Sequence, residues 1–223
     1  MIVFDKVTLR YPYDEFDLLK GASFTLQDGV NTVLADAQSG KSSICKLLLK
    51  DIAPTSGQIF VDGLEISGIT NGNLDILYLP RNPVFFQRRS VQYNMEYPLK
   101  VRKVAKVQRQ ARVGEIAKQF GIQLDVKVRT LTQEQRRTLA LARGLTVKRK
   151  TVLFDNFFDG DTSDIQYINN ILQQFDTCVI LTSDPRFAVG HTVVLDGGVT
   201  VFEGDANQAQ QYVNNLHWLS LVQ

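Results

Sequence analysis

Runs of apolar residues separated by polar turns divide this chain into predicted strands and helices. Alternating or continuous apolar runs predict strands at 2–10, 22–26, 31–34, 58–63 and 151–155. Helical patterns occupy 44–49, most of about 85–145, and 206–222. The last of these follows Asp205, a candidate N-cap. Strands that alternate with helices predict an α/β sandwich with a partly parallel sheet.

The segment between the strand at 31–34 and the helix at 44–49 carries candidate phosphate-binding residues. Its sequence, L-A-D-A-Q-S-G-K-S-S at 34–43, ends like a P-loop, in which a helix N-terminus offers backbone N–H groups to phosphate. Lys41 would then contact the outer phosphates and Ser42 would bind Mg²⁺. The predicted nucleotide site comprises Ala35, Asp36, Ala37, Gln38, Ser39, Gly40, Lys41, Ser42 and Ser43.

Two observations leave structural alternatives open. The full P-loop motif begins with glycine, for its unusual φ and close backbone approach, but this chain has Ala35. The alternative is a strand–turn–helix that contains Gly-Lys-Ser without binding phosphate. Upstream, Tyr11 is a candidate to stack on an adenine, and the alternative is a tyrosine at a strand end that packs on the sheet.

Composition narrows the class of protein. The 223 residues are 44% hydrophobic and 22% charged, as in an ordinary globular domain, and a net charge of +2 does not call for a nucleic-acid partner. The isolated Cys45 and Cys178 are expected to be buried apolar residues. We expect no signal peptide at 1–5, and no apolar run is long enough for a membrane span.

A series of segments follows the P-loop in an order that resembles a known family. They are T-S-G-Q-I-F-V-D-G at 55–63, I-L-Y-L-P at 76–80, V-Q-Y-N at 91–94, E-Y-P-L-K-V-R at 96–102, L-T-Q-E-Q-R-R at 131–137, T-V-L-F-D at 151–155, V-I-L-T-S-D at 179–184 and V-V-L-D-G-G at 193–198. Their order and spacing, across nearly the whole chain, resemble the nucleotide-binding domain of ABC transporters.

This resemblance implies the fold, the cofactors and the partners. The fold is α/β: a P-loop NTPase core with a mixed sheet, N-terminal antiparallel β strands and an inserted helical subdomain at about 85–145, in a single domain of residues 1–223. The implied cofactors are ATP and Mg²⁺, with Ser42 and Asp155 as metal ligands. The implied partner is a membrane permease subunit or a second nucleotide-binding subunit, with a homodimer as the alternative, at the cytoplasmic face of a membrane.

Several positions depart from the family's pattern. Gln38 replaces a glycine of its P-loop, and Arg81 stands at the glutamine of its Q-loop, where a guanidinium cannot ligate Mg²⁺ but can neutralise phosphate. Asn156 follows the Walker B aspartate in place of glutamate, and an amide cannot take a proton from water. Ser183 replaces the switch histidine. The resemblance therefore implies that no catalytic group is intact at these positions.

The position of the family's signature motif, just before a predicted helix at 138–145, has also changed. It comprises Leu131, Thr132, Gln133, Glu134 and Gln135. Gln133 and Glu134 replace two glycines, so bulky side chains obstruct the approach of backbone N–H groups to nucleotide, and a carboxylate repels the γ-phosphate.

These features predict an ATP-binding transporter subunit with weak or absent hydrolysis. One alternative is a scaffold or regulatory pseudo-ATPase that has lost nucleotide binding. Another is a slow ATPase that uses Asp159 or Asp161, shortly after Walker B, as a relocated base.

A basic stretch within 100–112 has no assigned role. It contains Lys100, Arg102, Lys103, Lys106, Arg109 and Arg112, with no acidic residue among them. A solvated helix face is one interpretation, because Val101, Val104 and Val107 repeat at about helical spacing and would form its apolar side. Contact with anionic lipid and contact with nucleic acid are the alternatives.

Overall fold

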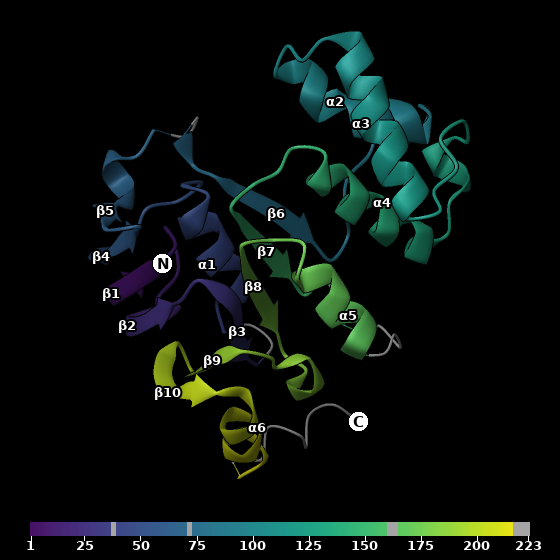
Figure 1. Cartoon of the computed structure of the whole chain (residues 1–223). Helices are drawn as coiled ribbons and strands as arrows, with labels where there is room; N and C mark the ends of the chain where they lie inside the picture. The colour runs from purple at the N-terminus through teal and green to yellow at the C-terminus, as the bar shows by residue number, and fades with distance from the viewer. Residues whose placement is uncertain (37–38, 71–72, 160–164, 216–223) are drawn as a thin grey trace. The chain divides into compact units, whose positions relative to one another are not determined.

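The computed structural model describes residues 1–36, 39–70, 73–159 and 165–215, and the chain forms two compact units. The first unit contains Met1–Tyr78 together with the chain from Lys150 onward, and the second contains Leu79–Arg149. Figure 1 labels the helices and strands of both units. Within the described residues, no helix is long and apolar enough to cross a membrane.

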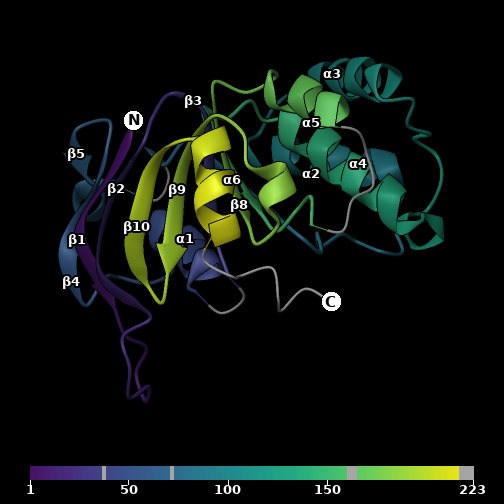
Figure 2. The ribbon, with the colours of Figure 1, turned by 90° about the horizontal axis from the view of Figure 1, so that it is seen from below.

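A four-stranded antiparallel sheet begins the first unit. Its order is β2-β1-β4-β5, formed by Leu19–Leu26, Ile2–Leu9, Ser56–Val61 and Leu64–Glu65. Phe4 pairs with Phe24 on one side and with Ile59 on the other, and all three side chains are buried. The connection between β1 and β2 projects from this sheet (Figure 2).

A six-stranded mixed sheet carries the predicted site. Its order is β10-β9-β3-β8-β7-β6, formed by Val199–Asp205, His191–Asp196, Gly29–Ala35, Thr177–Thr182, Thr151–Asp155 and Ile76–Pro80. Strand β8 is parallel to both β3 and β7, with Thr182 opposite Leu34 and Leu181 opposite Asp155. The carboxyl ends of these strands therefore lie at one edge, where α/β sheets bind ligands.

Helices α1 (Lys41–Leu48), α5 (Ile165–Leu172) and α6 (Ala206–Asn215) complete the main elements of this unit. Ile44, Leu47 and Leu48 of α1 share one hydrophobic core with residues of both sheets, because its apolar positions recur at helical spacing. Cys45 and Cys178 are both buried, as predicted. Short 3₁₀ turns lie at Ile66–Gly68 and Pro185–Phe187.

The second unit is helical, with α2 at Val91–Val101, α3 at Lys106–Gln119, a 3₁₀ turn at Val128–Thr130 and α4 at Gln133–Leu145. Ser90 caps α2 by accepting a hydrogen bond from the Tyr93 amide at 3.1 Å. Thr132 and Gln135 form a capping box at the start of α4, which explains why that helix begins five residues before the predicted 138.

The predicted strands and the α/β class are confirmed, while helix bounds differ from the prediction. The P-loop helix begins at Lys41 rather than 44, because Gly40 turns the chain directly into it. Asp205 accepts a hydrogen bond from the Asn207 amide at 2.8 Å, as an N-cap would. Helix α6 is described to Asn215, and residues 216–223 lie outside the described part of the chain.

The prediction that the basic stretch has an apolar helix side formed by Val101, Val104 and Val107 is wrong. The chain leaves the helical conformation between α2 and α3, so Val101 and Val107 belong to different helices, and their side chains are 64% and 79% exposed. Two of the basic side chains have local roles instead. Arg102 donates to the Val147 carbonyl at 3.0 Å, and Arg109 pairs with Glu96 at 3.5 Å.

Candidate nucleotide-binding site

The described part of the segment between β3 and α1 contains a glycine in the left-handed conformation directly before the helix. Gly40 takes φ 90°, and a Cβ there would also lie 3.2 Å from the Leu19 side chain. Glycine has no side chain to cap α1. The Ser43 N–H donates to the Gly40 carbonyl at 2.9 Å, while the N–H groups of Lys41 and Ser42 precede the helical bonding pattern and suit an anion. The Ser39 hydroxyl donates to the Asp36 carbonyl at 2.7 Å. The predicted positions 37 and 38 lie outside the described residues.

Lys41 is folded back against this loop. Its Nζ donates to the Ala35 carbonyl at 2.7 Å and to the Asp36 carbonyl, and only 5% of the residue is exposed. Burial lowers the pKa of Lys41, while the carboxylates of Asp159, Asp36 and Asp155 oppose that change. The Lys41 ammonium is thus a buried cation that neutral carbonyls bind directly. Such a cation is suited to neutralising phosphate.

Two predicted metal ligands meet at this edge of the sheet. The Ser42 hydroxyl donates to Oδ1 of Asp155 at 3.1 Å, and Asp155 is 5% exposed at the end of β7. A hydroxyl and a carboxylate are the hard oxygen donors that Mg²⁺ prefers, so the pair fits this ion. No group of three His, Cys, Asp or Glu side chains able to hold a metal ion occurs among the described residues. Phosphate and water would therefore have to supply the other ligands at this pair.

A third residue, Tyr78 of β6, contacts Asp155 of this pair. The sequence pattern does not predict a role for it at the site. Its hydroxyl donates to Oδ2 of Asp155 at 2.8 Å. Burial and the Asp155 carboxylate raise the pKa of Tyr78, so the phenol remains a donor. The available signal was alternation along β6, which places Tyr78 on the face opposite Leu77 and Leu79, but an aromatic residue in a strand ordinarily indicates core packing.

Asn156 and Ser183, where the resemblance predicts that a catalytic group is missing, follow β7 and β8 and lie close to Asp159. Oδ1 of Asp159 accepts from Thr182 Oγ1 at 2.5 Å, and the Ser183 backbone also donates to this carboxylate. Burial raises the pKa of Asp159, opposed by the Thr182 hydroxyl and by Lys41. Asn156 takes φ 48°, and its buried Oδ1 has no hydrogen-bond partner among the described residues. Asp161 is outside them.

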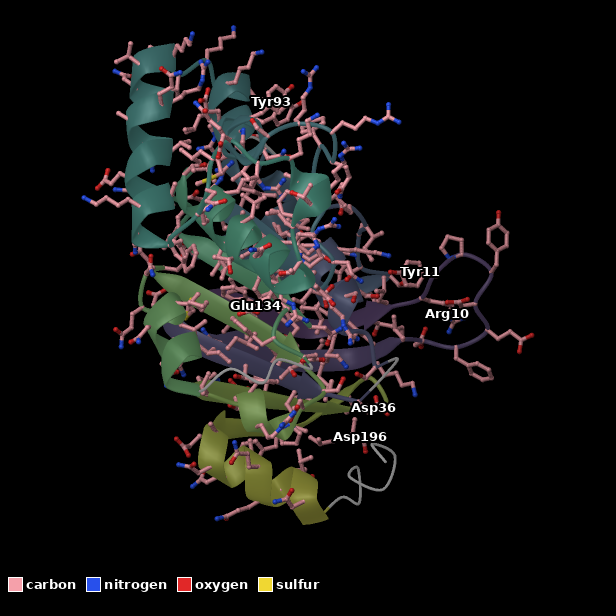
Figure 3. All side chains as sticks on the ribbon, turned by 90° about the vertical axis from the view of Figure 1, so that its right-hand side faces the viewer. Arg10, Tyr11, Asp36, Tyr93, Glu134 and Asp196 are labelled. Atoms are coloured by element: carbon pink, nitrogen blue, oxygen red, sulfur yellow. The ribbon has the colours of Figure 1, made fainter. Side chains whose placement is uncertain are left out.

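Tyr11 lies beside α1 through its hydroxyl. That oxygen is 3.0 Å from Ser43 Oγ, and the Lys46 Nζ lies 5.5 Å from the centroid of the ring. Figure 3 shows Tyr11 next to Arg10 at the base of the projecting β1–β2 connection. The arrangement brings the predicted adenine contact and the predicted phosphate loop together within the first unit.

The second unit holds the remaining predicted positions. Arg81 is exposed just after β6. Gln133 and Glu134 are exposed in the first turn of α4, where Figure 3 labels Glu134. Leu131 and Gln135 line a cavity of about 400 Å³ within this unit, and Thr132 is occupied as the N-cap.

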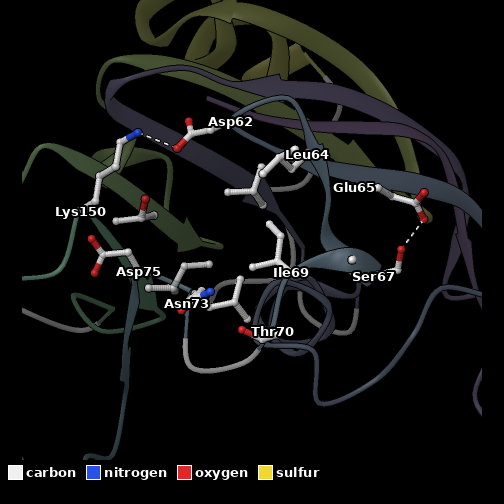
Figure 4. A pocket seen from close by; sticks show the side chains of 14 residues that line it. Asp62, Leu64, Glu65, Ser67, Ile69, Thr70, Asn73, Asp75 and Lys150 are labelled. Atoms are coloured by element: carbon white, nitrogen blue, oxygen red, sulfur yellow. Dashed lines mark hydrogen bonds and ion pairs between the residues drawn. The ribbon is translucent and has the colours of Figure 1, made fainter. Parts of the chain in front are cut away.

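A separate cavity of about 540 Å³ lies in the first unit and contains none of the predicted site residues (Figure 4). Its apolar lining includes Leu64, Ile69 and Leu74, and Lys150 pairs with Asp62 at 2.7 Å at its edge. The candidate site therefore does not depend on this cavity.

Comparisons with known proteins agree with the geometry. Residues 19–159 match the ABC transporter family model. The chain is 32% identical over 149 residues to a Pyrococcus horikoshii molybdate/tungstate import ATP-binding protein, WtpC, covering 66% of this chain and 43% of that protein. It is 29% identical over 196 residues to a Mannheimia succiniciproducens Fe(3+) ions import ATP-binding protein, FbpC, covering 83% and 56%.

The fold matches a solved structure across most of its length. A bacterial Atm1-family ABC exporter with ATP bound has a TM-score of 0.77 and 22% identity, over 95% of this chain and 40% of that one. The chain spans about half the length of the curated relatives it matches. On the family match, which covers more than half of its residues, the chain belongs to the ABC transporter family.

Proposed function

We propose that this chain is the ATP-binding subunit of an ABC-type transporter and that it binds nucleotide and Mg²⁺ with weak or absent hydrolysis. The observation that carries the proposal is the contact between Ser42 and Asp155 at 3.1 Å beside the buried Lys41 ammonium. Lys41 and the first turn of α1 bind phosphate oxygens, Ser42 and Asp155 hold the metal, and Tyr11 contacts the base.

Slow turnover follows from the groups that have been replaced. The amide of Asn156 takes no proton, Ser183 has no imidazole, and Arg81 has no oxygen for the metal. Gln133 and Glu134 stand where glycines would admit a nucleotide bound by a partner subunit. Each lost catalytic element commonly costs on the order of 10²-fold or more in rate, and such losses are not additive.

The names of relatives, import ATP-binding proteins for molybdate/tungstate and for Fe(3+) ions, support an import system without assigning a cargo to this chain. The proposed partner is a membrane permease subunit, joined by a second nucleotide-binding subunit or a second copy of this chain. The proposed location is the cytoplasmic face of a membrane. With a net charge of +2, the proposal includes no nucleic acid among the partners.

A second candidate function is slow hydrolysis with Asp159 as the base. Its carboxylate is partly buried, accepts from Thr182 and the Ser183 backbone, and is near enough to Lys41 for their charges to interact. In this step the water oxygen bonds to the γ-phosphorus and its proton passes to Asp159. The bond from that phosphorus to the β–γ bridging oxygen breaks, which yields ADP and phosphate. Loss of residual turnover in Asp159→Asn, with nucleotide affinity retained, would support it.

The stability of the chain with and without MgATP tests the proposed function. A ligand at 100 times its Kd stabilises the folded state by about 2.7 kcal/mol, which denaturant unfolding resolves. We expect MgATP to raise the free energy of unfolding of the wild-type chain by such an amount. We also expect a membrane protein to co-purify with the chain from source-cell membranes. A chain that gains no stability at saturating MgATP would instead favour the scaffold or regulatory pseudo-ATPase.

A further inference from the structure

We propose that Tyr78 is a positioning residue of the metal site: its hydroxyl fixes the Asp155 carboxylate in the orientation that Mg²⁺ binding requires. The inference rests on the proposed function, because the metal arrives with nucleotide. It assigns a role to a residue of β6 outside the P-loop and outside Walker B.

The Asp155 carboxylate is held from both sides by hydroxyl groups. Oδ1 accepts from Ser42 at 3.1 Å and Oδ2 accepts from Tyr78 at 2.8 Å. The terminal torsion of aspartate is broad by itself, so these two bonds decide the plane of the carboxylate. With Oδ2 engaged by Tyr78, Oδ1 is the oxygen directed at the other metal donor, Ser42.

Tyr78 is itself well anchored. Its ring packs against the hydrophobic core of the first unit, and β6 lies next to β7 in the sheet. Because only 5% of Asp155 is exposed, water has little access to replace a lost hydroxyl. Tyr78 is therefore held in place by its packing and donates directly to the carboxylate, as the outer partners of metal-binding carboxylates commonly do.

The residue at position 81 makes the hydroxyl of Tyr78 more important to the metal site of this chain. The residue three positions later, Arg81, cannot supply an oxygen to Mg²⁺. The hydroxyl of Tyr78 is then the neutral polar group that this strand contributes to the site. Removal of such an outer partner typically weakens metal affinity 10- to 100-fold.

The test is calorimetric titration of ATP into wild type and Tyr78→Phe, once with excess Mg²⁺ and once with excess EDTA. We expect equal affinities in EDTA and a loss of about tenfold or more in the Mg²⁺-dependent gain of Tyr78→Phe. Tyr13→Phe is the matched control, since Tyr13 is fully exposed. In an Asp155→Asn background, Tyr78→Phe should change the Mg²⁺ gain no further.

The other outcomes overturn the inference in distinguishable ways. An equal Mg²⁺ gain in wild type and Tyr78→Phe would overturn the positioning role alone and leave the proposed function intact. A Tyr78→Phe chain that unfolds would make the hydroxyl a structural requirement and also overturn it. A wild-type chain that binds no nucleotide would overturn the proposed function and this inference together.

Discussion

The Ser42 hydroxyl lies 3.1 Å from Oδ1 of Asp155, although 113 positions separate the two residues in the chain. The contact exists because β3, which leads into the P-loop, and β7, which ends at Asp155, both pair in parallel with β8. A hydroxyl in the first turn of α1 and a strand-end carboxylate are thus brought to one edge by the pairing of the sheet.

Burial of Phe154 is predicted to be a main source of stability for β7. Its ring is fully buried, with the Phe157, Phe158 and Phe175 centroids 5.6, 5.0 and 6.1 Å away. Phe154→Ala should lower the free energy of unfolding by about 3–5 kcal/mol in denaturant titration. Phe16→Ala, at a 78% exposed position, is the control and should change it little. Similar losses in both variants would contradict the assigned core.

The ring of Tyr11, rather than its hydroxyl, is predicted to bind the nucleotide base. Tyr11→Ala should weaken ATP affinity about tenfold, because stacking of an aromatic on a base contributes about 1–3 kcal/mol. Tyr11→Phe removes the contact to Ser43 but keeps the ring, and should stay within about twofold of wild type. Fluorescence titration measures both, with Tyr13→Ala as control. If Tyr11→Phe and Tyr11→Ala lost ATP affinity equally, the hydroxyl rather than the ring would be responsible.

Restoring a carboxylate at Asn156 is predicted not to restore fast turnover. The proposed function also assigns slow turnover to Ser183 and to the signature position, which this variant leaves unchanged, so phosphate release by Asn156→Glu should stay within about tenfold of wild type. The variant should also lose roughly 1–2 kcal/mol of stability, because φ is 48° there and asparagine tolerates that region better than glutamate. Asn156→Gln controls for size. Rapid turnover in Asn156→Glu alone would refute the account of the other losses.

The stability of the free chain should depend on pH through Asp159. Its folded-state pKa is raised, chiefly by burial, so the folded state binds the proton more tightly than the unfolded state does. Asp159 therefore favours folding below its ordinary pKa and loses that contribution as pH rises through the raised value. Asp159→Asn should be more stable than wild type at neutral pH, and the gain should shrink toward about pH 4. If the stability gained by Asp159→Asn were the same at every pH, the raised pKa of Asp159 would not be its cause.

Much of this site could be predicted from the sequence because local patterns encode it. Gly40, Lys41 and Ser42 lie between a strand and a helix, and Asp155 ends an apolar run, so each is recognisable from its neighbours in the chain. The same applies to the strands of the central sheet, whose apolar runs end in turn residues.

The rest depends on contacts between distant segments. The bond from Tyr78 to Asp155 requires β6 to lie beside β7, 77 positions away, and nothing in the local sequence marks Tyr78 as polar in function. Spacing alone predicts one apolar face for Val101 and Val107, because it does not show that the helix stops between them. The helix break depends on the chain's tertiary path, which spacing does not record.

Calorimetric titration of ATP into wild type and Lys41→Ala, with and without Mg²⁺, tests the central claim most directly. Lys118→Ala is the control, because Lys118 is exposed in α3. The account predicts saturable binding by wild type and Lys118→Ala, tightened by Mg²⁺. It predicts a loss of at least about tenfold in Lys41→Ala, since the proposed function pairs the buried ammonium with the phosphates. Equal affinity in wild type and Lys41→Ala, or no binding by either, would contradict it.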